Sequence, residues 1–286
     1  MLDQAESLRK LINSEDQKNK KTSTKFITVT SGKGGVGKSN FVVNLAIVLQ
    51  NKGKRVLIFD ADLGMGNDDV LMGIYPKNNI FDIIFTDLGI KDIIVEGTNG
   101  VSLIPAGSAL SKAQDLEEND KKIFLEKLDT LDEYDYILMD TGAGVNKDVL
   151  SFIAASEELI LITTPEPTSL TDGYSLIKAI DHYKLKTSAK VIVNKAFTRE
   201  EGEDTYNRFN IAVSKFLKIN IEYLGCILDD KKLVQSVRQQ KPFVVLYPNC
   251  DAAKDIENIA MKLMGQEMNS LNGAKGLFKR WFNLFS

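Results

Sequence analysis

The segment from Thr30 to Ser39, TSGKGGVGKS, contains the residues whose types and spacing best suit phosphate chemistry. Gly32, Gly37, Lys38 and Ser39 fit the G-x-x-x-x-G-K-[ST] phosphate-binding pattern. Glycines let the backbone curl so that several N–H groups point at phosphate oxygens. The Lys38 ammonium would reach the β- and γ-phosphates, and the Ser39 hydroxyl would hold Mg²⁺. The sequence therefore predicts a nucleotide-binding loop.

The elements that must position this loop flank it on both sides. Residues 26–30 (FITVT) read as a buried strand, and residues 39–49 read as an apolar helix whose N-terminus would face the phosphates. The same alternation continues along the chain. Further strands are expected at 55–60, 101–104, 135–140, 158–164, 189–194 and 222–228, and helices at 38–51, 120–130, 147–156, 169–184, 203–218, 230–238 and 251–264. This order predicts the α/β fold of a P-loop NTPase, a mostly parallel twisted sheet with helices on both faces.

The composition is that of a soluble globular chain large enough for such a core. Of 286 residues, 43% are hydrophobic and 26% are charged, and the net charge of −3 gives no reason to expect nucleic-acid binding. Cys226 and Cys250 form no zinc pattern, which favours a reduced, cytoplasmic chain. No signal peptide is recognised, and no apolar run is long enough to cross a bilayer.

Acidic and amide side chains end several expected strands, where ligands of a parallel sheet bind. Asp60 and Asp62 follow the second strand and share one side of an extended segment. Asp140 closes an apolar strand, an arrangement that suits Mg²⁺ binding directly or through water. Asn194 ends a later strand, and its amide offers both a donor and an acceptor.

Lys33, a second lysine early in the loop, makes the segment GKGGVGKS resemble the deviant phosphate-binding loop of the MinD/ParA ATPase family. That resemblance implies that Lys33 reaches the nucleotide of the partner subunit in an ATP-dependent homodimer. The segment DADLGMGN at 60–67 resembles switch I of the family, which implies that Asp62 handles the attacking water and Asp60 supports the Mg²⁺ shell. Segments 140–144 and 163–168 resemble the family's switch II and T-x-P-E segments.

These patterns define the expected site. The expected catalytic residues are Lys33, Lys38 and Asp62, and the expected metal ligands are Ser39, Asp60 and Asp140. The expected cofactors are ATP or ADP with Mg²⁺, and the resemblance implies slow, dimerisation-activated hydrolysis of ATP. The expected nucleotide-binding residues are Gly32, Lys33, Gly34, Gly35, Val36, Gly37, Lys38, Ser39, Asn40 and Asn194, the last as the reader of adenine.

The N-terminal segment distinguishes branches of the family. Residues 1–13 form an expected amphipathic helix, and their DQAESLR run resembles the extension of the FlhG/FleN/YlxH flagellar branch. That resemblance implies contact with FlhF, the flagellar GTPase of the signal-recognition-particle type, and stimulation of its hydrolysis. Residues 14–25 are expected to form a flexible linker, and residues 26–264 the ATPase domain.

The C-terminal segment reads as an interfacial anchor. Residues 265–273 are an expected linker, and residues 274–286 an amphipathic membrane-targeting helix. Its apolar side chains fall within an arc of roughly 160°, and they are Leu277, Phe278, Trp281, Phe282, Leu284 and Phe285. The resemblance to MinD-like proteins implies peripheral binding at the inner face of the cell membrane. The alternative is a helix docked on the protein body or on a partner.

The expected function is a MinD-like ATPase that regulates flagellum number and placement, cycling between a membrane-bound dimer with ATP and a cytosolic monomer with ADP. One alternative is a division-site ATPase with the same chemistry, against which the N-terminal segment argues. A ParA-type partitioning ATPase would need a dense basic cluster, which the sequence lacks. A nucleotide-gated binding module with negligible hydrolysis also stays open. Iron–sulfur relatives are disfavoured because no suitably placed cysteine pair exists.

Overall fold

The structure is a computed structural model that describes residues 24–62, 66–80, 82–105, 118–265 and 273–285. The expected N-terminal helix, nearly all of the linker after it, and most of the linker before the C-terminal helix lie outside the described residues.

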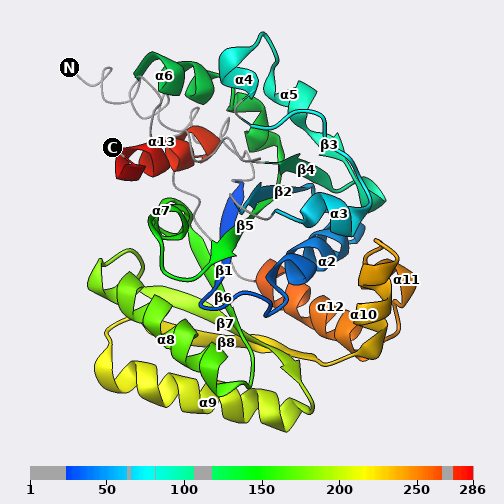
Figure 1. Cartoon of the computed structure of the whole chain (residues 1–286), viewed down its shortest axis with the longest axis vertical. Coiled ribbons are helices and arrows are strands. Elements are labelled where there is room, and N and C mark those ends of the chain that lie inside the picture. The colour runs from blue at the N-terminus through cyan, green and yellow to red at the C-terminus, as the bar shows by residue number, and fades with distance from the viewer. Residues whose placement is uncertain (1–23, 63–65, 81, 106–117, 266–272, 286) are drawn as a thin grey trace, which may run out of the picture.

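The described core is one sheet with the strand order β3-β4-β2-β5-β1-β6-β7-β8 (Figure 1). All neighbouring strands pair in parallel except β3 and β4. Each strand expected from the sequence is confirmed, and the two-residue strand β3 was not predicted. The strands are β1 (Lys25–Ser31), β2 (Val56–Ala61), β3 (Val95–Glu96), β4 (Ser102–Pro105), β5 (Tyr136–Ala143), β6 (Glu158–Thr163), β7 (Ser188–Ala196) and β8 (Asn220–Leu228).

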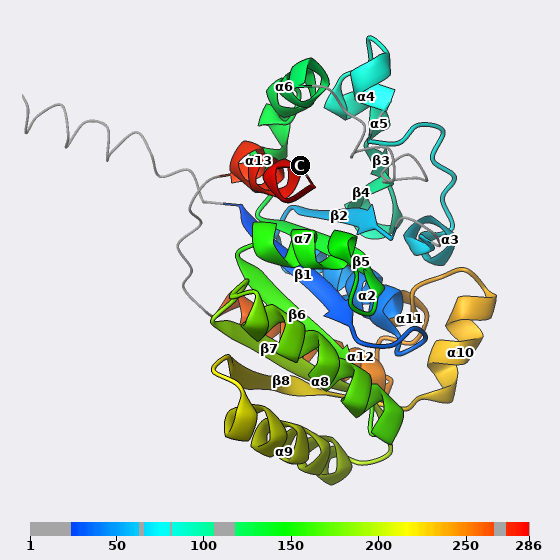
Figure 2. The same ribbon diagram turned by 60° about the vertical axis from the view of Figure 1, so that its left-hand side comes forward.

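Helices cover both faces of the sheet, as the predicted fold class requires (Figure 2). Alternate residues of β1 point to opposite sides: Ile27 belongs to the core beneath α2 and α12, and Phe26 to the core beneath α7. Burial on both faces explains why the strands read as continuous apolar runs. The longer helices are α2 (Lys38–Asn51), α6 (Glu118–Glu126), α7 (Lys147–Ala155), α8 (Pro167–His182), α9 (Arg199–Phe216), α10 (Lys231–Arg238), α12 (Asp251–Met264) and α13 (Gly273–Phe285).

Several short elements were not predicted, because each is close to a single turn. They are α3 (Asp68–Met72), α4 (Asp82–Phe85), α5 (Ile90–Ile93), α11 (Phe243–Leu246) and the 3₁₀ turns η1 (Thr98–Gly100) and η3 (Asp129–Glu133).

The C-terminal helix α13 is docked on the body of the protein beside α7 (Figure 2). Trp281 is fully buried and stacks on Phe152 of α7, with ring centroids 5.2 Å apart. Phe278 meets Phe59 of β2 edge-on at 5.6 Å. Asp132 of η3 accepts a hydrogen bond from the first turn of α13, at 2.8 Å. Of the apolar face predicted to meet a membrane, Leu277, Phe278, Trp281 and Phe282 are thus covered by protein in this structure.

Docking of α13 buries apolar side chains and so stabilises the folded protein. Full burial of a large apolar side chain stabilises a protein by about 1.5–3 kcal/mol. Leu277, Phe278, Trp281 and Phe282 are all buried. Any role of this face at a membrane therefore requires that α13 first leave its site. Among the helices that the structure describes, none combines the length and hydropathy of a membrane span.

Candidate nucleotide-binding site

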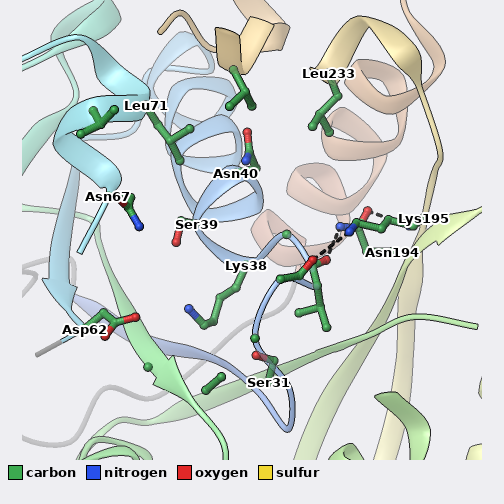
Figure 3. A pocket seen from close by; sticks show the side chains of 18 of the residues that line it. Ser31, Lys38, Ser39, Asn40, Asp62, Asn67, Leu71, Asn194, Lys195 and Leu233 are labelled. Atoms are coloured by element: carbon green, nitrogen blue, oxygen red, sulfur yellow. Dashed lines mark hydrogen bonds between the residues drawn. The ribbon is translucent and has the colours of Figure 1, made fainter. Parts of the chain in front are cut away.

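A cavity of about 930 Å³ opens where β1, β2, β5 and β7 end (Figure 3). Its floor is the loop that follows β1, and Gly34 to Asn40 line it. Asp62, Gly142 and Asn194 line it from the neighbouring strand ends. Its rim is apolar and comes from α3 and α10, through Val70, Leu71, Leu233, Val234 and Val237.

The backbone of the loop is shaped to receive an anion. Gly35 and Gly37 have φ angles of 77° and 94°, the left-handed region in which a side chain would be strained. Successive residues of this kind turn backbone N–H groups into one concave surface. No side chain caps the N-terminus of α2, so the first N–H groups of that helix face the cavity without a capping partner. Phosphate oxygens fit this arrangement.

Other elements hold the loop in place. Asn194 donates a hydrogen bond from Nδ2 to the Val36 carbonyl at 2.7 Å, and its Oδ1 accepts from the Lys195 backbone N–H. Lys195 Nζ donates to the Gly35 carbonyl at 2.8 Å. Gly32 lies so close to α8 that an added Cβ would be 2.1 Å from the Asp172 carbonyl carbon. The Asn194 amide thus positions the phosphate-binding loop, and its role in reading adenine stays a prediction.

The lysine of the loop is paired with the aspartate at the end of an apolar strand. Lys38 Nζ lies 3.1 Å from Asp140 Oδ1, and both side chains are buried. Burial raises the pKa of Asp140, an effect opposed by the charge of Lys38 and by a hydrogen bond from Ser39. The pair joins β5 to the start of α2, at the position where the sequence predicts Mg²⁺ and phosphates.

The carboxyl groups at the C-terminal end of β2 lie beside this pair. Burial, and then the charge of Asp140, raises the pKa of Asp60 to about 7. Gly66 passes so close that an added Cβ would be 2.3 Å from Asp60 Oδ2. Asp62 lies at the cavity wall and faces Gly142. A Cβ added at Gly142 would be 3.5 Å from Asp62 Oδ1. Buried carboxylates with a serine hydroxyl are hard oxygen donors, so these residues fit Mg²⁺.

Asp68 is a buried acid that the sequence analysis missed. It begins α3, is fully buried, and its pKa is raised well above the usual value by burial and then by the charges of Asp140 and Asp60. No sequence pattern points to this burial, because paired aspartates at the start of a helix are ordinarily solvated.

Lys33 lies outside the cavity lining and points to α8. Its Nζ donates to Glu166 Oε2 at 3.1 Å and to Thr168 Oγ1 at 2.9 Å. Both charged side chains are well exposed. The lysine that the family resemblance assigns to a partner's nucleotide is therefore held within its own subunit here.

The structure thus brings together most of the expected site residues. Gly34 to Asn40, Asp62 and Asn194 share the cavity, whereas Gly32, Lys33, Asp60 and Asp140 do not line it. Asp60 and Asp140 lie within the sheet, paired in register at the ends of β2 and β5.

Several known proteins are similar to this chain in sequence and in fold. A family model described as an AAA domain matches residues 24–193. The flagellum site-determining protein YlxH of Helicobacter pylori is 36% identical, over 98% of this chain and 98% of that protein. The antiactivator FleN of Pseudomonas aeruginosa is 34% identical, over 83% of this chain and 85% of that protein. The septum site-determining protein MinD of Pyrococcus horikoshii, solved with Mg-ADP, superposes with a TM-score of 0.66 and 24% identity, over 85% of this chain and 96% of that one.

A phosphate-binding loop between a buried strand and a helix of a parallel sheet defines a P-loop nucleotide-binding protein. The chain belongs to the MinD/ParA family of P-loop ATPases, in the branch of the flagellar regulators. The fold class and the family resemblance predicted from the sequence are confirmed. Proteins of this family are ATPases, and the Pyrococcus horikoshii structure of the same fold contains Mg-ADP.

Proposed function

We propose that this chain is a Mg²⁺-dependent ATPase that regulates flagellum number and placement, and that ATP converts a cytosolic monomer with a docked tail into a dimer at the inner face of the cell membrane. The observation that carries this proposal is the position of α7. Asp148 and Val149 in its first turn line the cavity, and Phe152 near its other end stacks on Trp281 of α13.

The chemistry follows from the residues around the cavity. Lys38 and the start of α2 would bind the terminal phosphates, with Ser39, Asp60 and Asp140 holding the ion. Bound Mg²⁺ would supply positive charge at the β- and γ-phosphate oxygens. The Asp62 carboxylate, at the cavity wall, would orient the attacking water. Lys33 would leave Glu166 and add a positive charge to the partner's nucleotide, so that hydrolysis depends on dimerisation.

The link to the membrane follows from the elements that share the site and the tail dock. Phe59, next to Asp60 in the chain, touches Phe278, and α7 touches Trp281. Movement of β2 or α7 when ATP binds would disturb the surface that α13 covers. Two released tails in a dimer bind a membrane far better than one. ATP binding, dimerisation and membrane binding are then coupled equilibria.

The N-terminal segment, residues 1–13, supplies the proposed contact with FlhF. Leu2, Ala5 and Leu8 would dock the helix in a groove, and Gln4 would act on the GTPase site. A peptide of residues 1–20 should speed GTP hydrolysis by FlhF, and the Gln4→Ala peptide should not. An inert wild-type peptide, together with normal stimulation by a chain lacking residues 1–20, would contradict this role.

Flagellum counting by electron microscopy tests the proposal as a whole. Cells whose own copy carries Lys38→Ala should show an altered number or placement of flagella, because the chain can no longer bind ATP productively. Lys178→Ala, an exposed lysine on α8, is the matched control. Unchanged flagella in Lys38→Ala cells, with altered division sites instead, would favour the division-site alternative.

A further inference from the structure

Asp68 is a buried acid to which the proposed ATPase cycle gives no role. It is 0% exposed, and neither of its carboxylate oxygens has a hydrogen-bond partner. An ionised carboxylate in such a place costs several kcal/mol unless a positive charge compensates it. Its neighbour Asp69 shows the ordinary behaviour, since it is only half-buried and accepts a hydrogen bond from the Val70 backbone N–H at 2.7 Å.

The groups around Asp68 do not balance its charge. The charges that act on it most strongly are those of Asp140 and Asp60, followed by Lys38. Asp140 and Asp60 are themselves only 1% and 6% exposed. Lys38 is the cation of this group and is already bonded to Asp140. Asp60, Asp68 and Asp140 thus set three carboxyl groups against the one ammonium of Lys38, an excess of acidic groups that a divalent cation would offset.

We propose that Asp68 is a third acidic residue of the Mg²⁺ site, and that with Asp60 and Asp140 it lets the chain hold a divalent cation before nucleotide binds. The inference rests on the proposed function, in which Asp60 and Asp140 hold the ion. Among the described residues, no three acidic, histidine or cysteine side chains are placed to ligate one ion directly. At least one carboxylate therefore acts through water that the ion keeps, as Mg²⁺ commonly does in proteins.

This role gives the burial of Asp68 a physical reason. Outer acidic groups orient the inner ligands and the coordinated waters, and their removal lowers metal affinity by about 10-fold to 100-fold. The cation would also offset the mutual repulsion of the carboxylates, so that the site is already charge-balanced when a nucleotide arrives. The chain would then bind metal first and nucleotide second.

Titration with Mn²⁺, followed by the electron paramagnetic resonance signal of the free ion, tests the proposal on the full chain stripped of metal and nucleotide. The wild-type chain should bind Mn²⁺ without nucleotide. Asp68→Asn, which keeps the shape of the side chain and removes its charge, should weaken this binding by about 10-fold or more. Asp69→Asn makes the same change at the adjacent residue and should bind Mn²⁺ like the wild type.

A second measurement separates this inference from the proposed function. Binding of a fluorescent ATP analogue at saturating Mg²⁺ reports whether the loop is intact, and Asp68→Asn should reach the same maximal binding as the wild type there, because excess metal compensates for its weaker site. Equal Mn²⁺ affinity in Asp68→Asn and wild type, or no Mn²⁺ binding by the wild type, overturns the role of Asp68. Failure of the wild type to bind the analogue at all would instead overturn the proposed ATPase function.

Discussion

Lys33 and Glu166 form an ion pair between the phosphate-binding loop and the start of α8, with 3.1 Å between Nζ and Oε2. The two side chains are 40% and 63% exposed, and pairs of this kind contribute about 0–1 kcal/mol. The contact therefore orients Lys33 toward α8 without fixing it there. A lysine that must act on a second subunit needs such a weak resting contact, since a strong one would oppose dimerisation.

Glu166→Gln should strengthen the ATP-induced dimer. The neutral amide holds Lys33 less well, so the monomer is less favoured, and the dimer affinity should rise by a fewfold, consistent with the loss of about 0–1 kcal/mol. Lys33→Ala should still bind nucleotide through Lys38, yet form no dimer. Light scattering with a non-hydrolysable analogue measures both. Glu203→Gln, on the exposed side of α9, is the control, and a dimer of wild-type strength in Lys33→Ala would contradict the trans role of the lysine.

Asp62→Ala should separate hydrolysis from dimerisation. The carboxylate lies at the cavity wall beside Gly142, where it can orient water but is not needed to hold phosphates. We expect the variant to bind ATP and dimerise while hydrolysis falls by about 100-fold or more, in line with the loss of a positioned base. Single-turnover assays and gel filtration test this. If the variant cannot bind ATP, Asp62 serves metal binding or folding instead.

Asn194→Ala distinguishes two roles of one amide. Asn194 donates a hydrogen bond to the Val36 carbonyl, so loss of the amide should disturb the loop. The binding of ATP and of GTP should weaken to a similar extent, by about 1–3 kcal/mol, the cost of a buried carbonyl without a partner. An adenine reader would instead lose mainly its preference for ATP. Competition binding with both nucleotides separates these outcomes. Lys195→Ala removes a more exposed contact to the same loop and should have the smaller effect.

Local patterns were enough to predict the sheet and the loop, but not the contacts made over long distances. The strand at 26–30 and the helix beginning at Lys38 follow from an apolar run and a glycine motif, both visible within a few residues. The contact of Lys33 with Glu166 joins residues 133 positions apart, and nothing in either segment alone signals it. The two-residue strand β3 is similarly defined by its partner β4 rather than by its own sequence.

The tail shows a different reason for a missed feature. An apolar helix face has the same pattern whether it meets lipid or protein, so the arc containing Phe278 and Trp281 could not show that α13 docks on α7. Asp68 was missed for the converse reason, because charged residues are assumed to be solvated unless paired. In both cases tertiary packing buries the side chain, and the local sequence pattern does not predict that packing.

Lys279→Glu should weaken membrane binding and leave the docked tail intact. Lys279 is exposed on α13, so its charge faces away from the dock and toward any anionic surface. Each basic residue near such a surface contributes about 1 kcal/mol, and reversal of the charge, a change of about 2 kcal/mol, should lower vesicle affinity roughly 30-fold. Sedimentation with anionic vesicles and a non-hydrolysable ATP analogue measures this. Lys178→Glu on α8 is the control, and equal binding by Lys279→Glu would contradict a tail at the membrane.

Fluorescence of Trp281 should report the release of α13 directly, because it is the only tryptophan in the chain. In the docked state the indole is 0% exposed and stacked on Phe152, so acrylamide should quench it weakly. Addition of a non-hydrolysable ATP analogue should increase quenching in the wild type, since the tail leaves α7 when the dimer forms. Lys33→Ala, which keeps the nucleotide but not the dimer, should stay weakly quenched under the same conditions. Phe282→Glu places a charge in the docked face and should be quenched strongly without nucleotide. If the analogue leaves Trp281 protected in a wild-type chain that has dimerised, the tail stays docked in the ATP state, and the membrane must bind through another surface.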